Sequence, residues 1–537
     1  MIMSKEFLRD LSRRRGSLFI TAITTVTLYL GGGLSLSVSS AAAASQHAPP
    51  NLLFIVVDEQ RYDTLAAAGN NRIQVPNLNR LAEESLVFQR AYCCQPVCGP
   101  SRSSIFTGTW PHWNGQTENR KPMRDKIPCL PALISKGGYV KAFLGHVGAL
   151  RNGQGAVPSG KDVDVSEHFR WPPDSYLRPR GASPAGGDRF DKLNRMLLPE
   201  ELSGPKYLAE RAERFLDRVE GRPFLLCCSF YEPHGPFYGP FNHVHAPEDV
   251  ILPRNFADVP QRNQPLKAQL EQRWFYQHGD TGTPGPLRTE HDWRVVIARY
   301  WGLCTLVDKY IGRILQALRD RGLYENTLIV FTADHGEMMG SHRMMLKNMA
   351  FEESVRVPLL IRLPGQTESK RIAAPVSQID LVPTLLDLLG QDAPAHLQGK
   401  SLRPLIDQSS GPPSAGDVFF EWHGINALVQ RDLQRDPLPE YIVEIATRER
   451  ALAALADPVR SLVTPDGWKL NYSPLGEHEL YNLNRDPGET QNLAGKPEHR
   501  HRMNALGRRI KRWQKETEDP VQLPDLGRAD QNLRRAD

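Results

Sequence analysis

The chain has 537 residues, of which 40% are apolar, so it is long enough for one large domain with a smaller one, or for two to three ordinary domains. Its formal net charge is +5, and three of these charges lie in residues 1–44. The remainder is close to neutral, which argues against a general nucleic-acid-binding protein, because such proteins are usually more basic.

The first 44 residues have the features of an export signal. Arg13, Arg14 and Arg15 precede an apolar stretch from 18 to about 38, and a run of alanines at 41–44 offers small-residue cleavage sites. Arginines directly before the apolar stretch indicate a twin-arginine signal, with an ordinary secretory signal as the alternative. An uncleaved anchor is a further alternative, but threonines and glycines dilute the apolar run, and no other stretch is apolar enough to span a bilayer. We therefore expect a periplasmic or secreted protein with no stable membrane insertion.

After this leader, short apolar runs rich in β-branched residues alternate with helical patterns. Strands are expected at 51–58, 139–144, 224–230, 327–334 and 358–362. Helices are expected from Pro76 to Ala82 and over 295–318, where an apolar face repeats at helical spacing and Gly322 follows. This alternation predicts an α/β fold with a large, mostly parallel sheet flanked by helices. Long loops are expected at 155–205, which is rich in proline and glycine.

Beyond residue 411 the pattern changes. A linker-like segment at 411–414 is followed by short strands at 417–422, 460–472 and 479–483, and by a basic helix at 497–516. These elements predict a small antiparallel sheet with a helix and a polar tail. The basic cluster at 508–515 is either a solvated helix face or an anion site. The predicted organisation is an export signal at 1–44, a catalytic domain at 45–410 and a C-terminal subdomain at 411–537.

The segment Cys98-Gly99-Pro100-Ser101-Arg102, with Thr107-Gly108 downstream, resembles the sulfatase signature C-x-P-S-R. Sulfatases belong to the alkaline-phosphatase-like superfamily, and a formylglycine-generating enzyme oxidises this cysteine in them. The resemblance implies that Cys98 becomes formylglycine, whose hydrate attacks the ester with one hydroxyl and expels the anion with the other. It also implies that Arg102 lies one turn into the next helix, beside the nucleophile and the metal. Taken alone, the motif would also fit a buried cysteine before a helix.

Two expected strands end in acidic residues, and ligands bind at the carboxyl ends of strands in such sheets. Asp58-Glu59 and Asp334-His335 resemble the two metal-binding pairs of the family, in which the first pair is most often Asp-Asp. The resemblance implies metal ligands at Asp58, Glu59, Asp334, His335 and the modified Cys98. Carboxylates with one imidazole suit Ca²⁺, or Mg²⁺ or Mn²⁺. Strand-end acids unrelated to a metal are the alternative.

Three further segments resemble the anion-binding parts of the family. Lys347, thirteen residues after Asp334, matches a lysine that holds the anion, for which a mobile point charge is suited. His234, in a Ser-Phe-Tyr-Glu-Pro-His-Gly-Pro-Phe run, matches a histidine that contacts the anion and protonates the leaving group. Asn119, twenty-one residues after Cys98, matches an active-site asparagine of phosphonate monoester hydrolases, and many sulfatases also have an asparagine there. With the C-terminal strands included, the resemblance spans about 50 to 493.

The chain departs from the family pattern after the strand near 140. Sulfatases usually have G-K-x-H there, whereas this chain has His146 at the lysine position and Gly148 at the histidine position. His146 would have to serve as the base that breaks the covalent adduct. Phosphonate monoester hydrolases, which resemble sulfatases in fold and formylglycine, also lack this pair and have an Asp-His metal pair.

Three functions follow from these patterns. The first is a sulfatase that cleaves sulfate esters of polysaccharides or aryl sulfates, with specificity set by loops that include 155–205 and 240–290. The alternative is a phosphonate monoester or phosphodiester hydrolase on the same scaffold. A non-catalytic protein that binds sulfated glycans is a third, against which the retained Cys98, Arg102 and Lys347 argue.

Overall fold

The structure, a computed structural model, describes residues 49–526 except 120, 125–126, 148–161, 170, 178–196, 280–284, 408–415 and 425–427. The expected export signal, the linker at 411–414 and Gly148 lie outside the described residues. Residues from Ala48 onward form one compact unit. Within the described part, no helix combines the length and apolar character that crossing a membrane requires.

A nine-stranded sheet forms the centre, in the order β4-β3-β5-β1-β6-β8-β2-β7, with β9 paired to β2. Its strands are β1 (Asn51–Asp58), β2 (Leu86–Tyr92), β3 (Val140–Gly145), β4 (Val165–His168), β5 (Phe224–Pro233), β6 (Thr327–Ala333), β7 (Arg356–Val357), β8 (Leu359–Arg362) and β9 (Lys370–Ser377). The run from β4 to β6 is parallel, and β8 is antiparallel to both β6 and β2. The predicted α/β fold with a mostly parallel sheet is confirmed.

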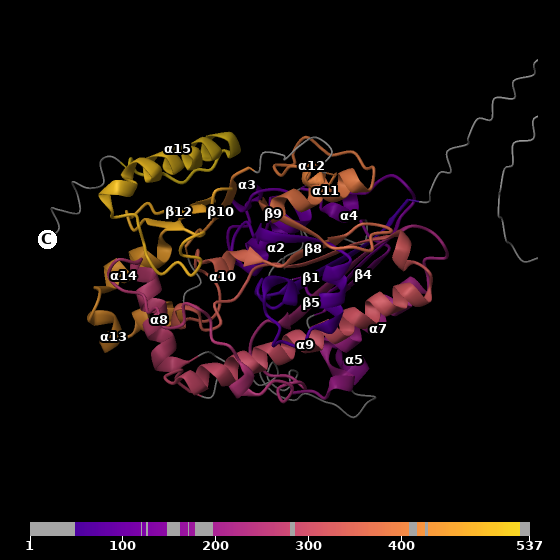
Figure 1. Cartoon of the computed structure of the whole chain (residues 1–537), viewed down its shortest axis with the longest axis horizontal. Coiled ribbons are helices and arrows are strands. Elements are labelled where there is room, and N and C mark those ends of the chain that lie inside the picture. The colour runs from indigo at the N-terminus through magenta and orange to yellow at the C-terminus, as the bar shows by residue number, and fades with distance from the viewer. Residues whose placement is uncertain are drawn as a thin grey trace, which may run out of the picture. The chain divides into compact units, whose positions relative to one another are not determined.

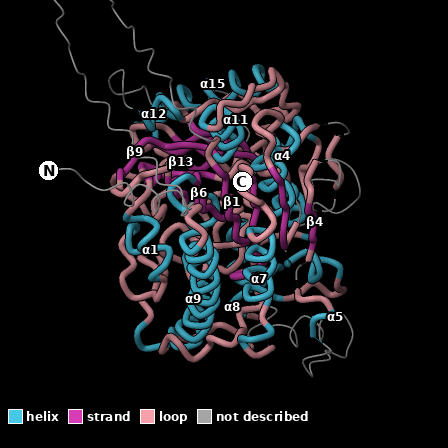
Figure 2. The backbone as a smooth tube through the Cα atoms, turned by 90° about the vertical axis from the view of Figure 1, so that its right-hand side faces the viewer, coloured by secondary structure: helices cyan, strands magenta, loops and turns pink. Residues whose placement is uncertain are grey.

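Helices cover both faces of this sheet, as Figures 1 and 2 show. The long helix α9 (Glu290–Asp320) and α7 (Gly204–Leu216) lie on one face, and α2 (Cys98–Thr107) and α11 (Leu381–Leu388) lie on the other. Thr289 and Asp292 form a capping box that starts α9. The remaining α-helices are α1 (Pro76–Glu83), α3 (Pro111–Asn114), α4 (Leu130–Leu133), α5 (Asp174–Leu177), α8 (Leu266–His278), α10 (Glu352–Val355), α12 (Arg403–Asp407), α13 (Glu440–Val443), α14 (Arg448–Ala456) and α15 (Arg500–Thr517).

Helix α2 is held against the sheet by aromatic packing. Phe106 contacts Phe54 of β1 and Phe143 of β3 edge-on, at ring-centre distances of 5.7 and 5.5 Å. All ten residues of α2 are buried, although four of them are serine or arginine. Buried polar groups need partners, so this helix is expected to be part of a polar site rather than of a purely apolar core.

The described residues of the segment 155–205 contain regular elements that the sequence did not predict. They include β4 and the short α5, and α7 begins at Gly204. The strand β4 lies at the edge of the sheet and pairs with β3 alone. Its sequence, Val-Ser-Glu-His, therefore lacks the continuous apolar run that is typical of a central strand buried on both faces. The expectation of loops alone was therefore wrong for this part.

The C-terminal part contains a separate four-stranded sheet in the order β10-β11-β12-β13, each strand antiparallel to the next. The strands are β10 (Val418–Glu421), β11 (Arg460–Val463), β12 (Trp468–Tyr472) and β13 (Glu479–Asn482). Helix α15 packs on it through a core that includes Leu470, Leu506 and Trp513. The predicted small antiparallel sheet with a helix is confirmed, and the expected segment 460–472 is a hairpin that turns at Gly467.

A buried ion pair joins the C-terminal sheet to the short helix α3. His112 of α3 contacts Glu421 of β10 through Nδ1 at 2.8 Å and the carbonyl oxygen of Thr517 through Nε2 at 2.9 Å. Both partners accept hydrogen bonds, so the doubly protonated imidazolium satisfies both. Burial lowers the pKa of His112, but the Glu421 carboxylate outweighs this and raises the pKa above its ordinary value.

We expect His112→Asn to destabilise the fold by about 1–3 kcal/mol near pH 6 and by less near pH 9. A raised histidine pKa contributes stability that is complete below the unfolded-state pKa and is lost as the pH rises through the folded-state pKa. Urea unfolding of the variant and the parent at the two pH values measures this. His291→Asn, at an exposed position, is the control. An equal loss of stability at both pH values would contradict the assignment of an imidazolium.

Candidate active site

Polar side chains from four neighbouring strands and from α2 meet at the carboxyl ends of the central strands. Asp58 ends β1, Asp334 follows β6, His146 follows β3 and His234 follows β5. Asp58 and Asp334 have no exposed surface, and His146 is 5% exposed. These strands are adjacent and parallel, so their carboxyl ends bring together residues that are far apart in the sequence.

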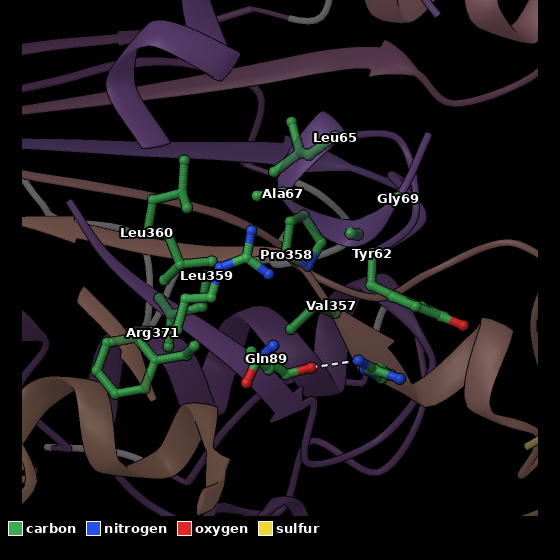
Figure 3. Close-up of a pocket in the computed structure, with 14 residues that line it drawn as sticks. Tyr62, Leu65, Ala67, Gly69, Gln89, Val357, Pro358, Leu359, Leu360 and Arg371 are labelled. Atoms are coloured by element: carbon green, nitrogen blue, oxygen red, sulfur yellow. Dashed lines mark hydrogen bonds between the residues drawn. The ribbon is translucent and has the colours of Figure 1, made fainter. Parts of the chain in front are cut away.

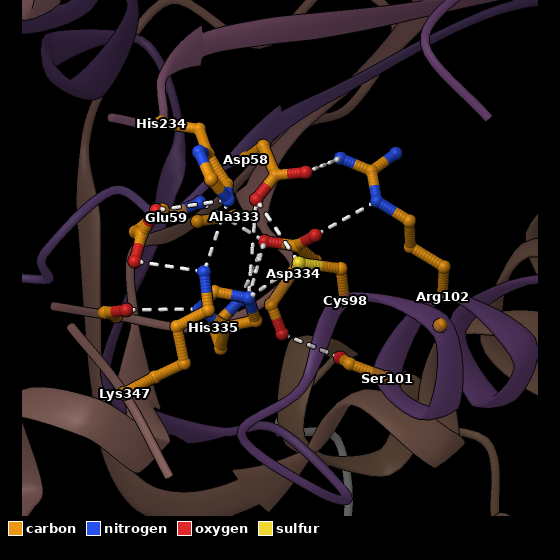
Figure 4. Close-up of polar contacts among 12 residues, drawn as sticks. Asp58, Glu59, Cys98, Ser101, Arg102, His234, Ala333, Asp334, His335 and Lys347 are labelled. Carbon is orange, nitrogen blue, oxygen red and sulfur yellow. Dashed lines mark hydrogen bonds and ion pairs between the residues drawn. The ribbon is translucent and has the colours of Figure 1, made fainter. Parts of the chain in front are cut away.

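Cys98 is the first residue of α2 and lies among these side chains (Figure 4). Its Sγ is 3.5 Å from Oδ1 of Asp58 and 3.2 Å from Nε2 of His335. Burial and the nearby Asp58 carboxylate hold the pKa of the Cys98 thiol well above its ordinary value. A cysteine nucleophile needs a lowered pKa to react as the thiolate, so these surroundings do not favour a reaction at sulfur itself.

Arg102, one turn into α2, is fully buried and bridges the two aspartates. Its Nε donates to Asp334 at 2.7 Å and its Nη2 to Asp58 at 3.4 Å, while Nη1 donates to Ser229 at 2.7 Å and to the carbonyl oxygen of His146 at 3.2 Å. The guanidinium therefore fixes both carboxylates at the carboxyl ends of β1 and β6. Ser229 was not predicted as a site residue, although it begins the Ser-Phe-Tyr-Glu-Pro-His-Gly-Pro-Phe run that contains His234.

The two aspartates have opposite pKa shifts. Burial raises the pKa of Asp58, but His234, His146 and Arg102 lower it well below its ordinary value. Burial and repulsion from Asp58 raise the pKa of Asp334, although it accepts hydrogen bonds from Arg102 and from the backbone N–H groups of Glu59 and His335. One arginine thus contacts two buried carboxylates, and a divalent cation would neutralise the remaining negative charge.

Four buried side chains form a donor set that fits a divalent cation. Ligand atoms of Asp58, Cys98, Asp334 and His335 all lie within 4.8 Å of one another, and all four residues are buried. Nδ1 of His335 lies 2.9 Å from the carbonyl oxygen of Gly336, so it carries the proton and leaves the lone pair of Nε2 facing this group. Two carboxylates and a neutral imidazole converging in this way can hold a divalent cation, so the residues fit.

Glu59 lies beside this group and faces the other side of the site. Its Oε1 accepts from Nζ of Lys347 at 2.8 Å, and its Oε2 is 3.3 Å from Nε2 of His234. Burial raises the pKa of Glu59, but His234 and Lys347 lower it to about 2. The ligand atoms of Glu59, Asp58 and His234 also lie within 4.8 Å of one another, in a second group that shares Asp58 with the first.

Glu59 has a left-handed backbone, with φ of 69°, which is uncommon for a residue with a side chain. Tyr300 of α9 donates its hydroxyl to the Glu59 carbonyl at 2.9 Å, and the Glu59 N–H donates to Asp334. Strained backbone of this kind persists where the surroundings hold it and is frequent at functional sites. Tyr300 was not predicted, because its side chain fits the apolar face of α9.

Lys347 and His234 lie together on this second side. Nζ of Lys347 is 3.1 Å from Nε2 of His234, and Nδ1 of His234 contacts the Gly235 carbonyl at 2.8 Å and the Tyr231 hydroxyl at 3.1 Å. Burial lowers the pKa of Lys347, but the Cys98 and Glu59 side chains raise it well above its ordinary value. Both side chains are partly exposed, at 11% and 22%, so they line the accessible side of the site.

His146 and Asn119 complete the predicted set. Nε2 of His146 is 3.3 Å from Oδ2 of Asp58, and its ring packs edge-on against Tyr231 at 5.1 Å. Asn119 accepts from the N–H of Gly99 at 2.8 Å, so its side chain supports the backbone of the Cys98 segment. All ten predicted site residues therefore lie in one region.

Glu337 is a buried neighbour to which the sequence assigned no role. Its Oε1 accepts from the N–H groups of Met339, at 3.1 Å, and Leu346. Burial and the Glu59 carboxylate raise the pKa of Glu337 well above its ordinary value. The signal available in the sequence was its place three residues after Asp334.

A separate cavity of about 340 Å³ lies between residues 62–69 and the strands β2 and β8 (Figure 3). Its lining includes Tyr62, Leu65, Pro358 and Arg371, and none of the ten predicted site residues. The candidate active site is therefore distinct from this cavity.

Comparison with known proteins decides the family. The sulfatase family model matches residues 50–391, which is more than half of the chain. This chain belongs to the sulfatase family. The predicted enzyme class, a sulfuric ester hydrolase of the alkaline-phosphatase-like superfamily, is confirmed.

Among similar proteins, the multifunctional alkaline phosphatase superfamily protein PehA of Trinickia caryophylli is 28% identical, over 83% of this chain and 91% of that protein. An N-acetylglucosamine-6-O-sulfatase of Bacteroides thetaiotaomicron is 23% identical, over 90% of each chain. The solved structure of a phosphonate monoester hydrolase from Silicibacter pomeroyi superposes on this sulfatase with a TM-score of 0.70 at 24% identity, covering 88% of this chain and 96% of that one. This last likeness bears on the fold alone.

Proposed function

We propose that this sulfatase cleaves sulfate esters with a formylglycine formed from Cys98 and a divalent cation held by Asp58, Asp334, His335 and residue 98. The observation that carries the proposal is the placement of Cys98 between Asp58 and His335, with a thiol whose raised pKa disfavours reaction at sulfur. Formylglycine would supply, as its hydrate, one hydroxyl to attack the ester and another to release the anion. The cation would neutralise charge on the sulfate oxygens and on the hydrate.

The surrounding side chains would bind and orient. Arg102 holds the Asp58 and Asp334 carboxylates in place through hydrogen bonds. The Lys347 ammonium would bind the sulfate oxygens. His234 keeps Nδ1 against the Gly235 carbonyl, which leaves Nε2 toward the accessible side as the atom that would protonate the leaving oxygen. His146, in contact with Asp58, is proposed as the base that assists release of the anion, in place of the usual Lys/His pair.

The proposed substrates are sulfate esters of polysaccharides or aryl sulfates. Similarity to an N-acetylglucosamine-6-O-sulfatase and to an ulvan-active sulfatase supports a carbohydrate sulfate. Hydrolysis of phosphonate monoesters or phosphodiesters is the second candidate. Two observations favour it: His146 stands where sulfatases have lysine, and the relative PehA is described as multifunctional.

Four further proposals accompany this function. The cation is Ca²⁺, or Mg²⁺ or Mn²⁺, because two of the four proposed ligands are carboxylates and the hydrate of residue 98 would add a further oxygen. A formylglycine-generating enzyme matures Cys98, and the arginine-rich leader directs export to the periplasm or medium. The catalytic domain spans 45–410 and the C-terminal subdomain 411–537.

A matched pair of chromogenic substrates tests the choice of ester. Formylglycine-containing protein is assayed with para-nitrophenyl sulfate and with a para-nitrophenyl phosphodiester, each with Ca²⁺ and with Mn²⁺. We expect the larger kcat/KM on the sulfate. An equal or larger kcat/KM on the phosphodiester would overturn the proposal in favour of the second candidate.

A further inference from the structure

Lys347 lies between two residues with unusual backbone conformations. Leu346 has φ of 66° and Asn348 has φ of 84°, both in the left-handed region that residues with side chains rarely adopt. The conformation is costly for Leu346 and persists only where neighbouring groups hold it, whereas asparagine adopts it more readily than other residues with side chains. The direction of the Lys347 side chain therefore depends on what holds these two residues.

The Leu346 side is held from within the same loop. Its N–H donates to the Glu337 carboxyl group, and its carbonyl oxygen accepts from the N–H of Met338 at 2.7 Å. The Asn348 side is held from a distant part of the chain. The carbonyl oxygen of Asn348 accepts a hydrogen bond of 2.5 Å from Nζ of Lys267, in the first turn of α8.

Lys267 is an unusual residue for this contact, because it is only 7% exposed. Its Nζ lies 3.4 Å from the centre of the Trp422 ring, at the C-terminal end of β10, in a cation–π contact. Burial lowers the pKa of Lys267 to about 7, against the opposing effects of Glu271 and Asp457. Both the ammonium and the neutral amine have N–H groups that can donate to the carbonyl, so the contact holds in either state.

The space around this contact is small. A cavity of about 50 Å³ is lined by Lys267, Asn348 and Trp422, together with the acidic residues Asp457, Glu477 and Glu479. Such a cavity has room for a water molecule but not for a substrate. The contacts of Lys267 therefore join the Lys347 loop to the C-terminal subdomain and do not form a second site.

We propose that Lys267 is a positioning residue for Lys347. By holding the Asn348 carbonyl, it maintains the strained turn that aims the Lys347 ammonium at Glu59 and His234, and Trp422 holds Lys267 in place. The inference rests on the proposed function, in which Lys347 binds the sulfate oxygens. It gives the C-terminal subdomain a part in catalysis although none of the predicted site residues comes from it.

A double-mutant cycle tests this proposal. Lys267→Met is expected to lower kcat/KM on an aryl sulfate by about 10- to 100-fold, because small misplacements of a binding group are costly. In a Lys347→Ala background the same substitution is expected to lower kcat/KM by less than about two-fold, because the function that Lys267 supports is already lost with Lys347. Lys267→Arg, which keeps a donor and a cation over Trp422, is expected to recover part of the loss. Where Lys267→Met does not fold, Lys267→Gln replaces it in the cycle, with a smaller loss that also vanishes in the Lys347→Ala background.

The control is Lys370→Met, which removes another lysine that donates to a backbone carbonyl, at 2.7 Å from Ile406 O. It is expected to leave kcat/KM within about two-fold of the parent value. The positioning role would be overturned if Lys267→Met lowered kcat/KM by the same factor in the Lys347→Ala background as in the parent. It would also be overturned if folded Lys267→Met protein kept the parent kcat/KM. If Lys347→Ala itself retains full activity, the proposed role of Lys347 fails instead, so the two failures are distinguishable.

Discussion

Cys98→Ala is expected to lower kcat on a sulfate ester by about 10⁴- to 10⁶-fold, the range found when a covalent nucleophile is removed. The remaining side chains would still bind the anion, but no group would be left to form and break the covalent bond. Sulfate release by the variant and the parent, each matured in the presence of a formylglycine-generating enzyme, measures the effect.

Cys94→Ala is the matched control. Cys94 is buried four residues earlier and packs near Ser377 in a different core cluster, at 3.7 Å between Sγ and Oγ. This variant is expected to keep at least about half of the parent kcat, since it removes only a small side chain away from the site. Retention of more than a tenth of the activity by Cys98→Ala would exclude Cys98 as the nucleophile.

The second large effect is expected for Asp58→Asn. Asp58 has no exposed surface, and its carboxylate contacts Cys98, Arg102 and His146. Replacing it leaves the Arg102 and His146 side chains without that charge and removes a proposed ligand. Mutation of a residue that only hydrogen-bonds to a metal ligand lowers metal affinity about 10- to 100-fold. Because Asp58 is a proposed ligand itself, we expect its replacement to lower the affinity for the cation by more than about 100-fold.

Metal content per chain, by elemental analysis after dialysis, and turnover with added Ca²⁺ or Mn²⁺ measure this loss. Asp63→Asn is the control, because Asp63 pairs with Arg61 at 2.7 Å and takes no part in either group of candidate ligands. We expect the control to bind one cation per chain and the Asp58→Asn chain to bind none. Stoichiometric metal in folded Asp58→Asn protein would contradict the ligand assignment.

The central parallel strands could be predicted because each is a nearly continuous run of apolar residues. The segment Asn51–Asp58 is one such run and is a strand over that same range, and Asp334 lies directly after β6. The strands β2 and β9 were missed. The strand β2 carries Gln89 and Arg90, and β9 pairs with β2 alone and contains Pro375, so neither has the apolar pattern of a buried strand.

The partners of the candidate site residues were harder to predict than their types. Glu59 was predicted as a metal ligand, and its left-handed backbone directs its carboxylate to Lys347 and His234, in the second group of candidate ligands. Sequence motifs do not report backbone conformation at a residue that is not glycine. Lys267 lies in the segment 240–290, which was expected to form loops, but the structure places it in α8, where Trp422 packs against it.

The mass of the tryptic peptide that spans residues 91–102 tests the central claim most directly. Conversion of Cys98 to formylglycine removes one sulfur and two hydrogens and adds one oxygen, whereas Cys93 and Cys94 in the same peptide remain thiols. We predict the aldehyde mass in active preparations, with kcat proportional to the fraction of peptide converted. Full turnover of a sulfate ester by protein whose peptide keeps the mass of three thiols would contradict the account.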